Sequence, residues 1–155
     1  MTELTHVDPS GAARMVDVSE KNVATRLARA SGRLRTTPEV VAALRENSLA
    51  KGDALATARI AGIMAAKRTP ELVPLCHPIA ISGVKVDLTV TEDGVDIAAR
   101  VKTADRTGVE MEALTAVSVA GLTLVDMVKA LDPAAQITDV RVDEKLGGKT
   151  GTWRR

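Results

Sequence analysis

The 155-residue chain has the length of a single domain, and apolar residues make up 45% of it, enough for one packed core. Its formal net charge is +1 and Trp153 is its one aromatic residue, so the basic excess and the stacking surface of a general nucleic-acid binder are both absent. One cysteine excludes an internal disulfide framework, and the apolar runs are broken by charge, so we expect a soluble cytoplasmic protein with no membrane partner.

The first part of the chain combines a polar start with an ambiguous periodic segment. Residues 1–13 are polar and rich in turn formers, so we expect a flexible N-terminal tail before a single domain over residues 14–146. A short strand is expected at residues 15–18. Residues 23–35 fit both helical and strand spacing, but the alternation of arginines with small apolar residues around Gly32 favours a strand.

Two helices with recognisable start signals follow. The Thr-Pro pair at residues 37–38 supplies the cap and the first helical position of a short helix that should end near Asn47. Asp53 can cap a second helix, which the Thr-Pro pair at residues 69–70 is expected to stop. Residues 72–79 contain two prolines and are expected to be irregular.

The second half of the chain predicts a hairpin, a long helix and a last strand. Residues 84–90 and 95–101 alternate apolar and polar side chains on either side of an Asp-Gly turn. Residues 110–131 predict a long helix, residues 137–142 a last strand, and residues 147–155 a Gly-rich C-terminal tail. Antiparallel strands with helices inserted between them predict an α+β fold.

The long predicted helix is apolar on almost every side, so we expect it to be buried, in part between subunits. Its few charges are therefore conspicuous, because buried carboxylates are costly unless they are paired, and their pKa values can be tuned for acid–base chemistry. These charged residues are Glu110, Glu112, Asp126 and Lys129. The alternative is that Asp126 and Lys129 form an ordinary ion pair near a helix end.

The length of this helix constrains any shared site. Glu112 and Asp126 lie within roughly 40° of one helix face but roughly 21 Å apart along the axis. A small substrate does not reach both. If both serve one site, a second subunit supplies one of them, and two antiparallel helices related by a two-fold axis would form two equal sites.

Three shorter segments are chemical candidates. Lys51 precedes the helix capped by Asp53, where amide groups and the helix dipole favour anions, although a solvated lysine fits the same position. His77 is a candidate proton carrier or a structural residue. Cys76 and His77 are neighbours in an extended segment and point to opposite sides, which disfavours a nucleophile–base pair. With His6 in the tail, these residues do not fill a zinc site, so no metal is expected.

The tail from residues 145 to 151 resembles a phosphate loop, but Asp143 stands where the first glycine of that motif is required. It is either a lysine-bearing flap that closes over an anion or a disordered terminus. The candidates for binding a triphosphate are Lys21, Arg26, Lys67, Arg68 and Arg106. Taken singly, each has the properties of a surface charge.

Four segments resemble one family, the C proteins of molybdenum cofactor biosynthesis. They are MVDVSEK, KGDALATARIAGIMAAKRTPELVPLCHP, TGVEMEALTAVSVAGLTLVDMVKALD and KLGGKTG, and they follow the family's order and spacing from Arg14 to Gly151. The resemblance implies a ferredoxin-like fold and a hexamer of three dimers with sites at the dimer interfaces. It also implies a lyase reaction that converts 3′,8-cyclo-7,8-dihydro-GTP to cyclic pyranopterin monophosphate and pyrophosphate.

The same resemblance implies roles for individual residues. The catalytic residues would be Asp126, Lys51, Lys145, Lys129 and His77. The substrate pocket would be lined by Leu75, Cys76, His77, Glu110, Met111 and Glu112. Independently of the resemblance, the basic residues Lys21, Arg26 and Lys67 are expected to bind the substrate through their charge. Such a reaction needs proton transfers and anion stabilisation but no redox step, so no organic cofactor is expected.

Two other functions are compatible with the sequence. A non-catalytic nucleotide-binding or scaffold protein of the same fold would bind GTP-like ligands without turnover. A cysteine-dependent hydrolase would require Cys76 for activity.

Overall fold

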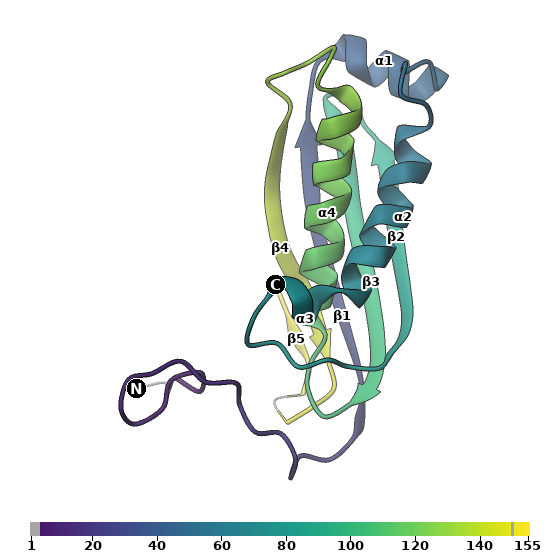
Figure 1. The fold of residues 1–155 in the computed structure, drawn as a ribbon. Coiled ribbons are helices and arrows are strands. Elements are labelled where there is room, and N and C mark those ends of the chain that lie inside the picture. The colour runs from purple at the N-terminus through teal and green to yellow at the C-terminus, as the bar shows by residue number, and fades with distance from the viewer. Residues whose placement is uncertain (1–3, 150) are drawn as a thin grey trace.

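The computed structural model describes residues 4–149 and 151–155 as one antiparallel sheet covered on one face by helices (Figure 1). The strands are β1 Ala24–Arg35, β2 Ile81–Val90, β3 Gly94–Asp105, β4 Gln136–Leu146 and β5 Trp153–Arg154. The helices are α1 Pro38–Glu46, α2 Ala54–Lys67, α3 Thr69–Leu72 and α4 Glu110–Val128. The sheet order is β2-β3-β1-β4-β5 with antiparallel neighbours throughout. The four long strands and the helices between them form the βαββαβ pattern, which confirms the α+β, ferredoxin-like prediction.

The predicted helix starts form as expected because their signals are local. The Thr37 hydroxyl accepts a hydrogen bond from the Val40 amide at 3.3 Å, with Pro38 in the first turn of α1. The Asp53 carboxylate accepts one from the Ala56 amide at 3.0 Å and caps α2. Asn47 ends α1 in the left-handed conformation, so the chain turns back sharply toward α2.

The core is built from alanine and valine because the two long helices pack closely on each other and on the sheet. On β1, the even-numbered residues from Ala28 to Leu34 face the helices and the odd-numbered arginines face the opposite side. Gly62 of α2 lies against α4, where a Cβ atom would come within 2.9 Å of the Ala116 carbonyl oxygen. This close approach explains why the interior holds no large aromatic side chain.

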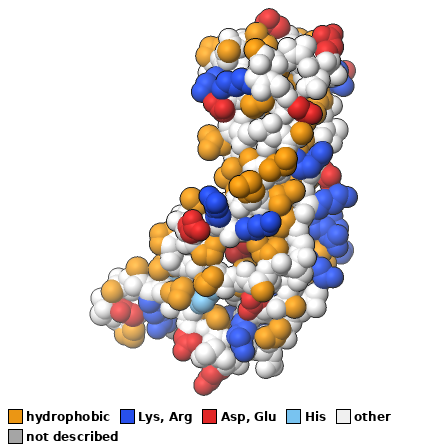
Figure 2. All heavy atoms as spheres, turned by 45° about the vertical axis from the view of Figure 1, so that its right-hand side comes forward, with side chains coloured by type: hydrophobic (Ala, Val, Ile, Leu, Met, Phe, Trp, Pro, Cys, Tyr) orange, Lys and Arg blue, Asp and Glu red, His pale blue; other side chains and the backbone are white. Residues whose placement is uncertain are grey.

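Helix α4 is long and apolar enough to cross a membrane by length and composition alone. Half of that stretch is buried inside the domain, against α2 and the strands, as for the core helix of a globular fold. Figure 2 shows apolar side chains gathered over the helical layer. Ile60 and Met64 of α2 and Leu122 of α4 are 49–61% exposed, so the helical layer presents an apolar outer surface.

The structure differs from the sequence expectations at several ends of elements. Residues 15–18 form no strand, because the Val16 carbonyl pairs with the His77 ring instead of a neighbouring strand. The second Thr-Pro pair starts the one-turn helix α3 immediately after α2 ends. Helix α4 ends at Val128, three residues early. Strand β4 is not the last strand, since β5 pairs with it through residues of the Gly-rich tail.

Candidate active site

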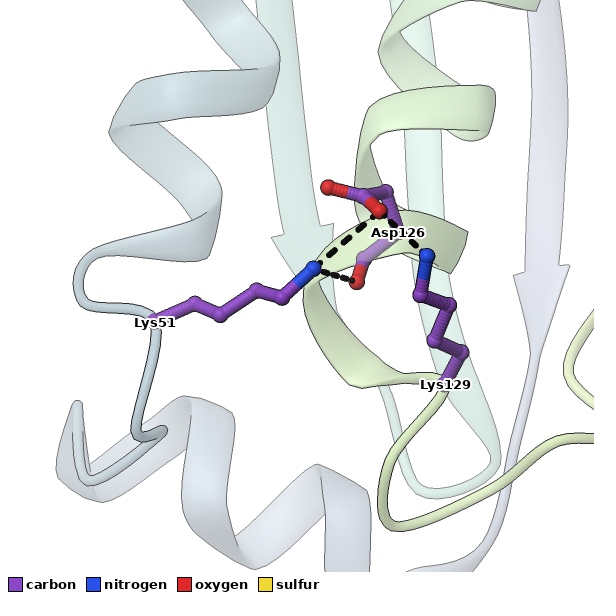
Figure 3. A network of polar contacts seen from close by, with 3 residues as sticks. All are labelled: Lys51, Asp126 and Lys129. Carbon is purple, nitrogen blue, oxygen red and sulfur yellow. Dashed lines mark hydrogen bonds and ion pairs between the residues drawn. The ribbon is translucent and has the colours of Figure 1, made fainter.

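Three predicted site residues meet at the C-terminal end of α4, and we call them the lysine–aspartate cluster: Lys51, Asp126 and Lys129. The Lys51 Nζ atom donates to Asp126 Oδ1 at 3.1 Å and to the Asp126 carbonyl oxygen at 2.9 Å. The Lys129 Nζ atom donates to the same Oδ1 at 2.7 Å. Figure 3 shows the two ammonium groups converging on the carboxylate from opposite sides.

The elements around this cluster explain its geometry. Lys51 lies in the loop between α1 and α2, which Gly52 turns with a φ of +101°. Asp126 and Lys129 are one helical turn apart, so they form an ion pair within α4. Lys51 adds a second ion pair to Asp126 from the loop before α2. The hydrogen bond from Lys129 is the largest cause that lowers the pKa of Asp126 below its ordinary value, and the hydrogen bond from Lys51 is the next largest. All three side chains remain about half exposed, so the cluster is open to a ligand or a partner chain.

A second group of predicted residues surrounds a cavity at the opposite, N-terminal end of α4, which we call the α4 pocket. Its volume is about 230 Å³. The predicted residues that line it are Lys21, Leu75, Cys76, His77, Glu110, Met111 and Glu112. The N-terminal residues Thr5, His6, Val16 and Val18 form another part of its wall.

Two acidic side chains give the α4 pocket its acid–base character. Glu112 is 2% exposed, and burial, followed by the nearby charge of Glu110, raises its pKa from 4.5 to about 7. A carboxyl group with this pKa can both give and accept a proton near neutral pH. Burial and the same two carboxylates raise the pKa of the Cys76 thiol, so it stays protonated and is a poor nucleophile.

Lys145 lies beside the α4 pocket, paired with its lining residue Glu110, and not in the lysine–aspartate cluster. Its Nζ atom lies 2.9 Å from Glu110 Oε1, and both side chains are largely covered, at 31% and 21% exposure. Strand β4 carries Lys145 alongside Ala28 of β1, on the face of the sheet that α4 covers. A semi-buried ammonium beside a carboxylate can stabilise a developing negative charge.

His77 is held by the N-terminal segment. Its Nε2 atom hydrogen-bonds to the Val16 carbonyl oxygen, and because a carbonyl only accepts, Nε2 carries the hydrogen. In a neutral ring with this tautomer, Nδ1 is the acceptor. The extended residues 15–18 therefore serve the site by orienting this histidine.

A basic cavity of about 420 Å³ lies next to the α4 pocket, with Lys21 lining both. Lys149 and Arg26 line it as well. Arg26 is only 8% exposed, and its Nε atom donates to the Asp105 carbonyl oxygen at 3.0 Å. The guanidinium lies against Gly148, where a Cβ atom would be 2.1 Å from Nη1. Glu20 is the one acidic residue in the lining, so the cavity offers an anionic ligand three cations against one carboxylate.

The structure separates the predicted catalytic residues into two groups. Lys51, Asp126 and Lys129 lie at one end of α4, whereas His77 and Lys145 lie at the other, roughly 21 Å away by helical rise. Lys67, at the end of α2, lines neither cavity. Sequence reasoning missed the pocket contributions of His6 and Lys149, because both fall in segments without periodicity.

No cluster of three or more His, Cys, Asp or Glu side chains within residues 4–149 and 151–155 is placed to hold a metal ion. The residues of the lysine–aspartate cluster and the α4 pocket offer ammonium, imidazole and carboxyl groups. These groups suit proton transfer and the stabilisation of anionic ligands.

Comparison with known proteins identifies the chain's relatives. Residues 15–148 match the model of the MoaC family. A "Cyclic pyranopterin monophosphate synthase" of Streptomyces avermitilis is 69% identical over 152 residues, covering 98% of this chain and 89% of the relative. One of Nocardioides is 66% identical, covering 98% and 95%. A "Cyclic pyranopterin monophosphate synthase 2" of Mycobacterium tuberculosis is 61% identical, covering 99% and 92%.

Proposed function

The chain belongs to the MoaC family, and from this premise we propose that it is a cyclic pyranopterin monophosphate synthase acting in molybdenum cofactor biosynthesis. Its substrate is 3′,8-cyclo-7,8-dihydro-GTP, and its products are cyclic pyranopterin monophosphate and pyrophosphate. The observation that carries the proposal is the pairing of acid–base groups in the α4 pocket with an adjoining basic cavity. Rearrangement of the substrate's ring needs the acid–base groups, and binding of its triphosphate needs the basic cavity.

The complete site is formed by two protomers. The lysine–aspartate cluster lies too far along α4 to reach a small molecule in the α4 pocket of the same chain. An antiparallel partner would bring its own Asp126 next to this chain's His77 and generate two equal sites. The exposed apolar side chains of α2 and α4 give such an assembly a surface to bury, in line with a hexamer of three dimers.

The roles follow from the surroundings of each group. Arg26, Lys21 and Lys149 bind the triphosphate, and His77 and Glu112 exchange protons with the rearranging ring. Closure of the cyclic phosphate forms a bond from a substrate hydroxyl oxygen to the α-phosphorus and breaks the α–β phosphoanhydride bond, so pyrophosphate leaves. Lys145 neutralises charge that builds up in this step, and the hydroxyl proton passes to a neighbouring base. No electrons are transferred, so no organic cofactor is required.

The direct test is incubation of the purified protein with 3′,8-cyclo-7,8-dihydro-GTP, followed by chromatographic detection of the pterin product and assay of pyrophosphate. We expect both products in equal amounts. Lys51→Ala and Asp126→Ala should abolish them while leaving the oligomer intact. The matched control is Lys85→Ala, which removes an exposed lysine on β2 whose partner is Asp87. Binding without turnover would instead identify a non-catalytic nucleotide-binding protein.

A further inference from the structure

The last three residues, Trp153, Arg154 and Arg155, fold back onto β4, and we call them the C-terminal strap. Figure 1 shows β5 at the C-terminal end of the chain beside β4. In this pairing Trp153 is opposite Lys145 and Arg154 is opposite Glu144. The Arg155 amide donates to the Asp143 carbonyl oxygen at 2.9 Å, and its Nε atom donates to the Val142 carbonyl oxygen at 3.0 Å. Each residue of the strap is thus tied to the strand that carries Lys145.

Charge pairing on the outer face of the sheet holds the strap in register. Arg154 Nε lies 3.1 Å from Glu144 Oε1, while Arg29 Nε of β1 lies 3.2 Å from Glu144 Oε2. Glu144 is only 17% exposed, and each of its two oxygens serves a different arginine. The strap is therefore connected through Glu144 to the centre of the sheet.

The register places Trp153 beside Lys145. Residues directly opposite each other in antiparallel strands share a face, with Cβ atoms about 4.5–5.5 Å apart. Lys145 is also opposite Ala28, which is fully buried under the helices, so this face is the one where Glu110 lies. Trp153 is 44% exposed, and the Arg155 guanidinium carbon lies 5.5 Å from its ring centroid. The chain's one aromatic residue is thus the strand neighbour of Lys145, the partner of the pocket residue Glu110.

The residues directly after β4 pack against β1 and the basic cavity. Gly147 has a φ of +83° and lies so close to β1 that a Cβ atom would be 2.3 Å from the Thr25 carbonyl oxygen. Gly148 rests on Arg26, and Lys149 lines the basic cavity. Lys149 is thus placed at the basic cavity by two glycines that pack directly on β1.

From this strand register we propose that Trp153 is a positioning residue for Lys145. In this proposal the ring lies against the lysine side chain and restricts it to conformations in which the ammonium group reaches Glu110 and the substrate. A free lysine side chain has many rotamers, and ordering it before the reaction removes part of the entropy cost of the transition state. This inference rests on the proposed function, since it takes Lys145 to act in the reaction.

Steady-state kinetics of Trp153 variants in the full-length oligomer test the inference. In Trp153→Ala we expect kcat to fall by about tenfold to a hundredfold with KM for the cyclised GTP changed by less than about threefold. Trp153→Phe keeps an aromatic cover and should restore kcat to within about threefold of wild type. Trp153→Thr keeps strand propensity without the ring and provides a second ring-free variant should the alanine variant fold poorly.

The control is Arg141→Ala on the same strand, which removes an exposed ion pair with Asp143. Thermal unfolding of every variant separates a loss of positioning from a loss of folded protein. A wild-type kcat in either ring-free variant, or a rise in KM alone, overturns the inference. Absence of product from wild-type protein overturns the proposed function itself, so the two failures are distinguishable.

Discussion

Lys51 and Asp126 are 75 residues apart in the chain, yet the Lys51 Nζ atom bonds both the carboxylate and the backbone carbonyl of Asp126, at 3.1 and 2.9 Å. This double contact ties the loop before α2 to the last turn of α4. It also places two ammonium groups on one carboxylate, since Lys129 binds the same oxygen. Asp126 is therefore held in its charged form at the exposed end of the helix.

The charge of Asp126 should depend more on Lys129 than on Lys51. We expect the carboxyl pKa to rise in both Lys129→Met and Lys51→Met, and by more in the former, because Lys129 is the closer cation and the larger cause of the lowered pKa. Carboxyl-carbon NMR titration measures this directly. An unchanged pKa in both variants would mean that the cluster does not persist in solution.

Asp126→Asn keeps the shape of the side chain and removes its charge. Turnover should fall by a factor on the order of 10² to 10⁴, the usual effect of losing a general acid or base. The melting temperature should stay close to that of wild type, because exposed ion pairs contribute little to stability. A large drop in melting temperature with normal turnover per folded protein would contradict a catalytic role.

Glu112 should make stability fall as pH rises. Its pKa is about 7 in the folded protein and 4.5 ordinarily, so between these values the folded state retains a proton that the unfolded state has released. Relative to Glu112→Gln, the free energy of unfolding of wild type should decline by roughly 1–3 kcal/mol from pH 5 to pH 8. Chemical denaturation at both values measures it, with exposed Glu71→Gln as the control. Parallel pH profiles for wild type and Glu112→Gln would contradict the burial argument.

Gly148 should matter for binding the triphosphate. An added Cβ atom would collide with the Arg26 guanidinium, and the φ of +83° disfavours any side chain. In Gly148→Ala we expect KM to rise by about tenfold, the equivalent of one weakened charge-assisted hydrogen bond. Gly83→Ala is the matched control, because a Cβ atom there would meet nothing within 4 Å. Equal KM values in the two variants would exclude the basic cavity as the phosphate site.

Cys76 should not be a nucleophile. Its raised pKa keeps the thiol protonated, so iodoacetamide should modify it more slowly than a free thiol at pH 7. Cys76→Ser should keep turnover within about tenfold of wild type, whereas loss of a true nucleophile costs about 10⁶-fold. A complete loss of activity in Cys76→Ser would revive the hydrolase alternative.

The parts of the fold that were predictable are those with local signals. Asp53 marked the start of α2, and the Asp-Gly pair at residues 93–94 lies where the β2–β3 hairpin turns. The alternation of polar and small apolar residues around Gly32 predicted strand β1 correctly. The ends of elements depend on tertiary partners, which the sequence does not reveal. Residues 15–18 form no strand because they have no strand neighbour. Strand β5 forms only because the C-terminal tail folds back onto β4.

For the site, the sequence indicated which residues carry chemistry but not which of them meet. The i,i+3 spacing offered the Asp126–Lys129 ion pair as one of two alternatives, and the structure contains it. The motif resemblance grouped Lys51 with Lys145 as catalytic lysines. Whether Lys145 lies beside Asp126 or beside Glu110 depends on the register of β4 against β1, a long-range property. The contributions of His6 and Lys149 depend on how both tails return to the domain.

The most direct test of a site shared between protomers is subunit complementation. Lys51→Ala disables the lysine–aspartate cluster, and Lys145→Ala disables the α4 pocket, so each variant alone should be inactive. After unfolding and co-refolding the two in equal amounts, half of the dimers are mixed, and each mixed dimer contains one fully intact site. The account predicts recovery of about a quarter of wild-type activity. A mixture that remains as inactive as its parents, although mass spectrometry shows mixed oligomers, would contradict it.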